Sequence, residues 1–144
     1  MFSKACEHAI KAMIFIAQIS KVGRRAGVKE IAENIDAPQH FIAKILQDLC
    51  RKGVLQSMKG PNGGFYLEQA DFNTSLAKIV KAVDGDKLYD ICVLGLKACS
   101  HKNPCPVHHE YVDIKKNIIL MLEKNTIEDF NEKMDSGKYY LKTE

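Results

Sequence analysis

Three cysteines in the second half of the chain are the residues best suited to chemistry. Cys92, Cys99 and Cys105 follow the spacing C-x6-C-x5-C, and thiolates are soft ligands that suit zinc or an iron–sulfur cluster. A zinc finger usually offers paired C-x2-C knuckles, and neither gap here is that short. Three widely spaced cysteines, with a fourth ligand from elsewhere, therefore favour a cluster over a zinc finger.

The cysteine segment also suits redox chemistry without a metal. Lys97, His101 and Lys102 lie near the thiols, and such cations lower the pKa of a thiol and favour the thiolate. Sensing by thiol oxidation thus stays open, as does a merely structural role for the three side chains. We expect Cys50 to be a buried apolar residue, and Cys6 to be a helix-surface or core residue and not a ligand.

An enzymatic role is not expected. A small thiol oxidoreductase needs a C-x-x-C motif beside a βαβ unit, and the sequence has neither. A pair such as Cys105 and His108 could support nucleophilic catalysis, but nothing in the pattern suggests a substrate cleft.

The elements that must position these groups are mostly helical. Apolar residues recur at helical spacing, which predicts helices over residues 5–20, 28–35, 41–53, 75–84 and 110–124. Two short β-prone runs, 54–58 and 65–67, flank a Pro-Asn-Gly-Gly turn and predict a hairpin. The fold class is therefore mainly α with a small β-hairpin.

Two of these helices and the hairpin form a known DNA-binding arrangement. Helices 28–35 and 41–53 are joined by a short turn containing Pro38, and Gly53 suits the left-handed position after the second helix. A tight turn between a short and a longer helix is typical of a helix-turn-helix, and a hairpin directly after it is a wing.

This pattern divides the chain into three parts. A winged helix-turn-helix domain is predicted over residues 1–70. A linking helix, a three-cysteine sensor loop and a long C-terminal dimerisation helix follow over residues 71–130, and a polar, disordered tail over residues 131–144. Helix 110–124 carries too much apolar surface for a solitary helix. Two explanations stay open: it packs against the first helix in the core, or part of this surface is buried against a second subunit.

Charge supports a nucleic-acid partner for the first part. Residues 1–67 contain ten Lys and Arg against five Asp and Glu, whereas residues 68–144 contain eleven against thirteen. A recognition helix needs polar side chains to reach base edges and cations to meet phosphates. The predicted DNA-contact residues are Arg24, Arg25, Lys29, Pro38, Gln39, His40, Lys44, Lys59, Asn62 and Gly63.

The segment from Val28 to Leu67 resembles the winged-helix regulators of the Rrf family, which includes IscR-like and NsrR-like members. The most specific stretch, GPNGGFYL, runs from Gly60 to Leu67, and the resemblance extends from Ser3 to about Phe130. It implies a transcriptional regulator whose homodimer pairs the long C-terminal helices and binds a palindromic site in double-stranded DNA.

The resemblance also implies a cofactor and its ligands. IscR- and NsrR-like proteins hold a [2Fe–2S] or [4Fe–4S] cluster on three cysteines with C-x5-C-x5-C-like spacing, and the first gap here is one residue longer. His108 matches the histidine of IscR-like members, and Glu7 matches the carboxylate that NsrR-like members offer from the partner subunit. We favour His108. Some family members lack a cluster and sense thiol oxidation or a small molecule instead.

The sequence gives no sign of a membrane protein. Lys11 interrupts the N-terminal apolar stretch, and nothing approaches the 18 or more apolar residues that a spanning helix needs. The opening residues lack the pattern of a secretory signal. We therefore expect a cytoplasmic protein.

Overall fold

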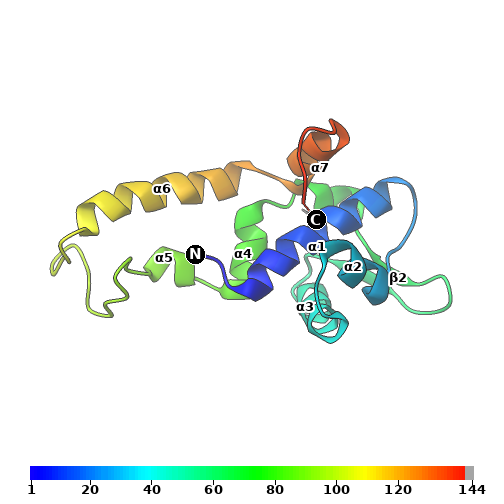
Figure 1. Cartoon of the computed structure of the whole chain (residues 1–144), viewed down its shortest axis with the longest axis horizontal. Helices are drawn as coiled ribbons and strands as arrows, with labels where there is room; N and C mark the ends of the chain where they lie inside the picture. The colour runs from blue at the N-terminus through cyan, green and yellow to red at the C-terminus, as the bar shows by residue number, and fades with distance from the viewer. Residues whose placement is uncertain (142–144) are drawn as a thin grey trace.

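The computed structural model describes residues 1–141 and confirms the predicted fold class, a helical chain with one antiparallel hairpin (Figure 1). The helices are α1 (Lys4–Lys21), α2 (Val28–Ile35), α3 (Gln39–Arg51), the 3-10 helix η1 (Gln69–Asn73), α4 (Leu76–Asp84), α5 (Lys87–Asp90), α6 (His108–Lys124) and α7 (Ile127–Asp135). The strands are β1 (Gln56–Met58) and β2 (Gly64–Tyr66).

Helix α1 is the centre of the core. It begins where the Ser3 hydroxyl accepts a hydrogen bond from the backbone N–H of Cys6 at 3.0 Å, a typical N-cap. Its apolar stripe, which includes Met13 and Ile16, is fully buried, and α2, α3, α4 and α7 all pack against the helix. Burial of this stripe is the main reason why the surrounding helices hold fixed positions.

The helix-turn-helix is formed by α2 and α3. Asp36 ends α2 in the left-handed conformation, with φ of 56°, and Pro38 caps the start of α3 with extended backbone. Ile31 and Leu46 are fully buried, which fixes both helices to the core. Gly53 has φ of 76°, and the left-handed position predicted for it is confirmed.

The wing, formed by β1 and β2, is part of a body that comprises residues 1–85 and 125–141. Backbone pairing that the sequence pattern did not predict holds the wing to the loop between α1 and α2. Strands β1 and β2 pair with Ser57 opposite Phe65. Ala26, in the loop between α1 and α2, adds two backbone hydrogen bonds to Phe65, at 3.0 and 2.8 Å. Gly64 is required at this junction, because a Cβ there would lie 2.7 Å from the Ala26 carbonyl oxygen.

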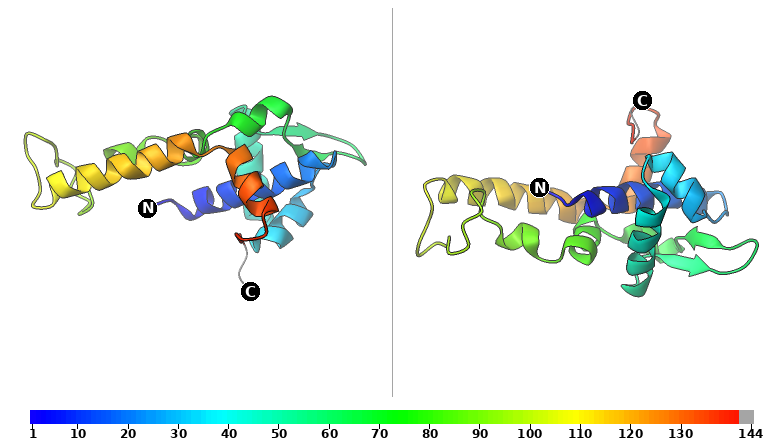
Figure 2. Two further views of the ribbon diagram at one scale, coloured as in Figure 1. Left: turned by 90° about the horizontal axis from the view of Figure 1, so that it is seen from above. Right: turned by 60° about the horizontal axis from the view of Figure 1, so that its bottom comes forward.

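Residues 86–124, which we call the arm, extend away from this body. The arm contains α5, the cysteine loop and α6, and all three views show it projecting from the body on the side opposite the wing (Figures 1 and 2). Helix α6 packs against α4, not chiefly against α1 as expected, and buries Leu122. The Lys115 ammonium donates a hydrogen bond to the Tyr89 carbonyl at 2.8 Å, which ties α6 to α5.

The prediction of a disordered tail from residue 131 is wrong for its first five residues. Helix α7 continues to Asp135, and Asn131 is fully buried. Thr126 and Asp129 form a capping box that starts this helix, and Ile127 anchors it in the core. The last three residues of the predicted tail, 142–144, lie outside the described residues.

The predicted sensor loop between helices 75–84 and 110–124 also contains more order than expected. Residues 87–90 form α5, which buries Leu88 against the core, and α6 starts at His108. Because so short an apolar run carries little periodicity, the pattern could not reveal α5.

Candidate DNA-binding surface and candidate metal centre

The N-terminal half of α3 presents the predicted base-contacting side chains to solvent. Pro38, Gln39, His40 and Lys44 are all exposed, whereas Ile42 on the opposite face is fully buried. An amide and an imidazole at the start of a helix can reach base edges in a major groove, and a lysine one turn later can reach a phosphate or a guanine.

The three cations predicted before and in α2 have different surroundings. The Arg24 guanidinium forms an ion pair with Glu30 at 3.0 Å. Arg25 is half-buried and lies over the Tyr66 ring, 5.1 Å from its centroid, so it links the α1–α2 loop to the wing. Lys29 is exposed, and it borders a groove of about 400 Å³ shared with Pro38 and Gln39. Lys29 is therefore the best placed of the three for a contact next to α3.

At the wing, Lys59 and Asn62 are exposed near its tip. Glycine is required at position 63 for a steric reason, because a Cβ there would lie 2.1 Å from the Met58 carbonyl oxygen. Gly60 adopts φ of 106° in open space and permits the turn itself. The glycines thus permit the tight hairpin. The exposed polar side chains of Lys59 and Asn62 are its candidate groups for DNA contact.

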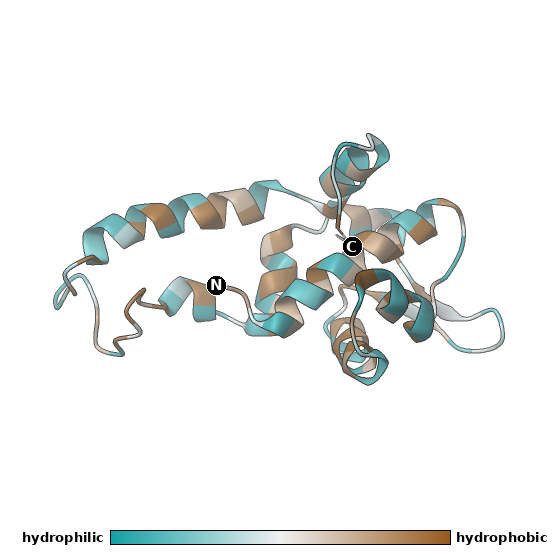
Figure 3. Ribbon diagram, viewed as in Figure 1, coloured by the Kyte–Doolittle hydropathy of each residue, from teal (hydrophilic) through white to brown (hydrophobic). Residues whose placement is uncertain are grey.

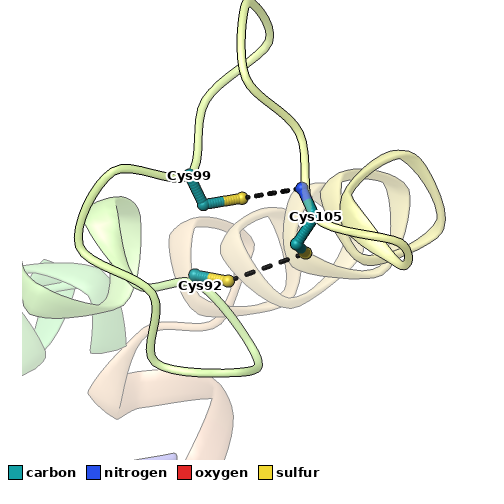
Figure 4. Close-up of side chains that lie close together, drawn as sticks. All are labelled: Cys92, Cys99 and Cys105. Atoms are coloured by element: carbon teal, nitrogen blue, oxygen red, sulfur yellow. Dashed lines mark hydrogen bonds between the residues drawn. The ribbon is translucent and has the colours of Figure 1, made fainter.

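The three cysteines converge between the loop and the start of α6 (Figure 4). Their sulfur atoms all lie within 4.8 Å of one another. The sulfur atoms of Cys92 and Cys105 are 3.8 Å apart, and the backbone N–H of Cys105 donates to the Cys99 sulfur at 3.4 Å. Together with His108, they line a cavity of about 40 Å³.

His108 completes this group as its nearest nitrogen donor. Its Nδ1 lies 3.2 Å from the Cys99 sulfur, because His108 is the first residue of α6 and follows Cys105 by one turn. Glu7 lies instead on α1, where its carboxylate pairs with Lys4 at 2.9 Å. Among the described residues of one chain, the structure therefore brings His108, and not Glu7, to the cysteines.

The thiols of the loop and the body differ in acidity. Hydrogen bonds from the backbone N–H groups of Leu96 and Leu94 lower the pKa of Cys92 to about 7. The backbone N–H of Cys105 favours the Cys99 thiolate, but desolvation and the neighbouring thiols outweigh it and raise the pKa of Cys99. Burial, followed by repulsion from Asp84 and Glu7, raises the pKa of Cys6 to about 12. Cys92 is thus the most acidic of these three thiols.

The pKa of His108 is lowered, first by desolvation and then by repulsion from His101 and His109. A neutral imidazole is the form that binds metals. The His108 Nε2 faces the Nδ1 of His101 at 3.4 Å, and these two residues form a compact group with His109. The sequence pattern identified His101 only as a cation near the thiols and assigned no role to His109, since the loop fold that joins them has no periodic signal.

The donor set fits an iron–sulfur group. Two thiolates on one metal at about 2.3 Å would be about 3.8 Å apart in tetrahedral geometry, which is the separation of the Cys92 and Cys105 sulfurs. Cys99 and His108 form a second close pair. Three thiolates and one imidazole in two pairs are chemically suited to a cluster.

No helix in residues 1–141 is both long enough and apolar enough to span a membrane.

A helix-turn-helix followed by a glycine-rich hairpin defines a winged-helix regulator. A family model described as Rrf2, iron-dependent transcriptional regulator, matches residues 2–133. An HTH-type transcriptional regulator of Aquifex aeolicus is 32% identical over 90% of both chains. The chain therefore belongs to the Rrf2 family of DNA-binding transcriptional regulators, and the predicted family is confirmed.

Named relatives fall in both predicted subgroups. NsrR of Oceanobacillus iheyensis is 23% identical over 88% of this chain and 86% of its own. IscR of Xenorhabdus nematophila is 24% identical over 85% of this chain and 73% of its own.

Solved structures share the fold. T. potens IscR superimposes with a TM-score of 0.74 at 18% identity, over 97% of this chain and 92% of that one. CymR, the global cysteine regulator of B. subtilis, gives 0.72 at 18% identity, over 92% and 97%.

Proposed function

We propose that this regulator binds DNA as a homodimer and responds to redox or nitric-oxide signals through an iron–sulfur cluster in the arm. The observation that carries the proposal is the convergence of three cysteine sulfurs and the His108 imidazole at the start of α6. The family description, iron-dependent transcriptional regulator, supports it.

In the proposed DNA complex, the N-terminus of α3 enters the major groove. Gln39 and His40 contact base edges, Lys44 reaches a guanine or a phosphate, and Lys59 and Asn62 follow the backbone from the wing. The exposure of these side chains above a buried Ile42 and Leu46 supports this orientation.

Helix α6 supplies the proposed dimer contact. Ile114, Leu120 and Met121 of α6 are 55%, 58% and 45% exposed. Figure 3 shows hydrophobic residues alternating with hydrophilic ones along this helix. Large apolar side chains that share a solvent-exposed helix are typical of an interface. Two copies paired through α6 would present two α3 helices to the halves of a palindromic site.

Cys92, Cys99, Cys105 and His108 would hold the cluster, and Glu7 of a second copy is the alternative fourth ligand. The bound cluster, [2Fe–2S] or [4Fe–4S], supplies a redox-active iron centre. The four donors form two close pairs, Cys92 with Cys105 and Cys99 with His108.

The chain's own contacts supply a route from this site to the DNA. Lys115 ties α6 to α5, and the far end of α6 is fixed to the body where Leu76 donates to the Asn125 carbonyl at 2.9 Å and Ile127 donates to the Thr74 carbonyl at 3.0 Å. A rearrangement of the cysteine loop would therefore tilt α6 relative to the body. In a dimer joined through α6, such a tilt changes the spacing of the two α3 helices.

A cluster-free thiol sensor is the second candidate, and two observations favour it. The pKa of Cys92 is about 7, and its sulfur lies 3.8 Å from that of Cys105. Hydrogen peroxide would oxidise the Cys92 thiolate to a sulfenic acid and release hydroxide. The Cys105 thiol would then condense with it to a disulfide and release water.

Cofactor content separates the two candidates. Protein purified without oxygen should contain iron and acid-labile sulfide and absorb visible light, and the Cys92/Cys99/Cys105→Ala variant should contain neither. His108→Ala should lose most of the iron, whereas Glu7→Ala should keep it. A colourless wild-type protein free of iron and sulfide would overturn the cluster proposal, and iron without sulfide would indicate a single ion.

DNA binding is tested by salt titration on a mixed-sequence duplex. Lys44→Ala and Lys59→Ala should each reduce the slope of log affinity against log salt by about 1, while Lys124→Ala, an exposed lysine at the end of α6, should leave it unchanged. Equal slopes for all three variants would argue against the proposed surface. The proposed coupling between the cysteine loop and DNA binding has a separate test. It fails if the Cys92/Cys99/Cys105→Ala variant binds DNA with the affinity of the wild type and responds to oxidant in the same way.

A further inference from the structure

A second group of metal-binding side chains lies beside the cysteines. His101, His108 and His109 each offer a ring nitrogen, and the three nitrogens lie within 4.8 Å of one another. His101 and His109 are exposed and His108 is half-buried, so the group opens to solvent at the tip of the arm. The proposed cluster uses only His108, and neither it nor the family description accounts for the imidazoles of His101 and His109 at this point.

The geometry of this group suits coordination. His108 contacts the other two rings edge to face, with centroids 4.8 Å from His101 and 5.2 Å from His109. Two imidazole nitrogens bound to one tetrahedral zinc at about 2.0–2.1 Å would be about 3.3 Å apart. The Nε2 of His108 and the Nδ1 of His101 are 3.4 Å apart.

The local sequence explains why the rings meet. His101 belongs to the loop two residues after Cys99, and His108 and His109 are the first two residues of α6. The turn that starts α6 is closed by the His108 N–H, which donates to the Cys105 carbonyl at 3.1 Å. The His109 side chain is exposed, so its ring can change rotamer without displacing buried neighbours.

We propose that His101, His108 and His109 form a binding site for a divalent late-transition-metal ion such as Zn²⁺, which lies beside the cysteine group and shares only His108 with it. Imidazole is a preferred ligand of zinc, copper and nickel. Three protein ligands leave the fourth position of a tetrahedral ion for water.

The two groups share His108, and its two nitrogens face opposite ways. Nδ1 faces the Cys99 sulfur at 3.2 Å, whereas Nε2 faces His101. When Nε2 of a neutral imidazole binds an ion, the ring proton is on Nδ1, which then donates to the Cys99 sulfur and is no longer a ligand. An ion on the histidines therefore withdraws the fourth ligand from the cysteine group. This coupling rests on the proposed function, whereas the ion site itself does not.

The ion site is tested in the full-length Cys92/Cys99/Cys105→Ser variant, which removes thiolate binding. Calorimetric titration with Zn²⁺ alone should give one ion per chain. Adding His101→Ala and His109→Ala should weaken binding at least about tenfold, because even outer-shell changes cost 10–100-fold. His40→Ala, on the exposed start of α3 and outside this group, is the matched control and should leave the affinity for Zn²⁺ unchanged. Absence of Zn²⁺ binding by the Ser variant, or equal binding after loss of both histidines, would overturn the site.

The coupling is tested on wild-type protein purified without oxygen. Zn²⁺ should release iron from it, and the His101→Ala/His109→Ala variant, which keeps all cysteines and His108, should resist release at the same Zn²⁺ concentration. Equal release from both proteins, or none from the wild type at saturating Zn²⁺, would overturn the coupling. If the wild type holds no iron or sulfide while the Ser variant still binds Zn²⁺, the cluster proposal fails and the histidine site stands.

Discussion

The winged body and the arm position the residues of their candidate sites in different ways. In the body, each exposed side chain of α3 is positioned by buried residues of the same helix, such as Ile42 and Leu46. In the arm, residues 86–124, only three side chains are buried: Leu88, Cys105 and Leu122. The cysteine loop is positioned mainly by turns and by the contacts among its own sulfur and nitrogen atoms.

This difference suits the two proposed tasks, DNA recognition by the body and cluster binding by the arm. A surface that reads base edges must keep its geometry, and burial on α1 provides that rigidity. A loop that takes up or releases a metal group must rearrange, and segments with few buried contacts open at low free-energy cost. If burial causes this difference, substitutions and chemical probes should affect the body and the arm unequally.

The largest effect is expected from matched leucine substitutions in the two regions. Leu46→Ala removes a fully buried side chain from the body and should lower the free energy of unfolding by about 2–5 kcal/mol. Leu94→Ala, in the cysteine loop, removes a side chain that is 56% exposed and should change it by about 0.5 kcal/mol or less. Urea denaturation at one protein concentration measures both. A comparable loss in the two variants would mean that the loop is packed as firmly as the body.

The second-largest effect is expected in the reactivity of cysteines, which should differ between Cys92 in the arm and Cys6 in the body. In apo protein at pH 7, Cys92 should react with iodoacetamide about 10²–10³-fold faster than Cys6, because their pKa values are about 7 and about 12. The ratio is smaller than the ratio of thiolate fractions, since a thiolate of lower pKa is also a weaker nucleophile. Since the pKa of Cys92 is lowered, its thiolate forms as the pH rises through about 7, and its rate should reach a plateau above that value. Peptide mass spectrometry follows each site, with Cys50 as a second body thiol. Equal rates for Cys92 and Cys50 would contradict the difference in acidity.

Most of the body could be predicted from its sequence, because its elements are long enough to show periodicity. The runs that became α1, α2, α3 and α4 each bury one stripe, and Gly53 and Gly85 end two of them. The pairing of Ala26 with Phe65 could not be predicted, since a single bridge between distant residues leaves no local pattern.

The arm was less predictable for a physical reason. Spacing could show that three cysteines share a loop, but not that their sulfurs lie within 4.8 Å or that His108 meets Cys99. Those contacts depend on the turns between Cys92 and His108, which no apolar stripe fixes. The continuation of α7 to Asp135 was missed because Asn131 is a polar residue in a buried position, which a hydrophobicity pattern assigns to the surface.

A smaller effect is expected in the wing, where two Gly→Ala substitutions separate the cost of a steric clash from the cost of a positive φ. Gly63→Ala should destabilise the protein by about 1–3 kcal/mol, because its Cβ would meet the Met58 carbonyl oxygen at 2.1 Å and backbone must move. Gly60→Ala has open space and carries only the cost of its positive φ, about 1 kcal/mol. Thermal unfolding monitored by circular dichroism compares the two variants. A larger loss for Gly60→Ala would show that the hairpin can relax around residue 63.

The smallest effect is expected where the chain returns from the arm to the body. Lys21, at the end of α1, pairs with Glu128 of α7 at 2.8 Å, and both side chains are about one-third exposed. Lys21→Met should cost about 0–1 kcal/mol, since solvent and salt screen such a pair, and a double-mutant cycle with Glu128→Gln isolates it.

The pH dependence of this pair has a definite sign. The hydrogen bond to Glu128 raises the pKa of Lys21 above 10.5, so its contribution is complete below that pH and is lost as the pH rises through the raised value. Lys4→Met, which breaks the more exposed pair with Glu7, is the matched control and should cost less. If the cycle gave a coupling above about 2 kcal/mol that salt did not reduce, α7 would be locked to the body by more than a surface ion pair. The packing of Ile127 and the capping box at Thr126 would then be the first contacts to re-examine, because they hold the same helix against α1 and η1.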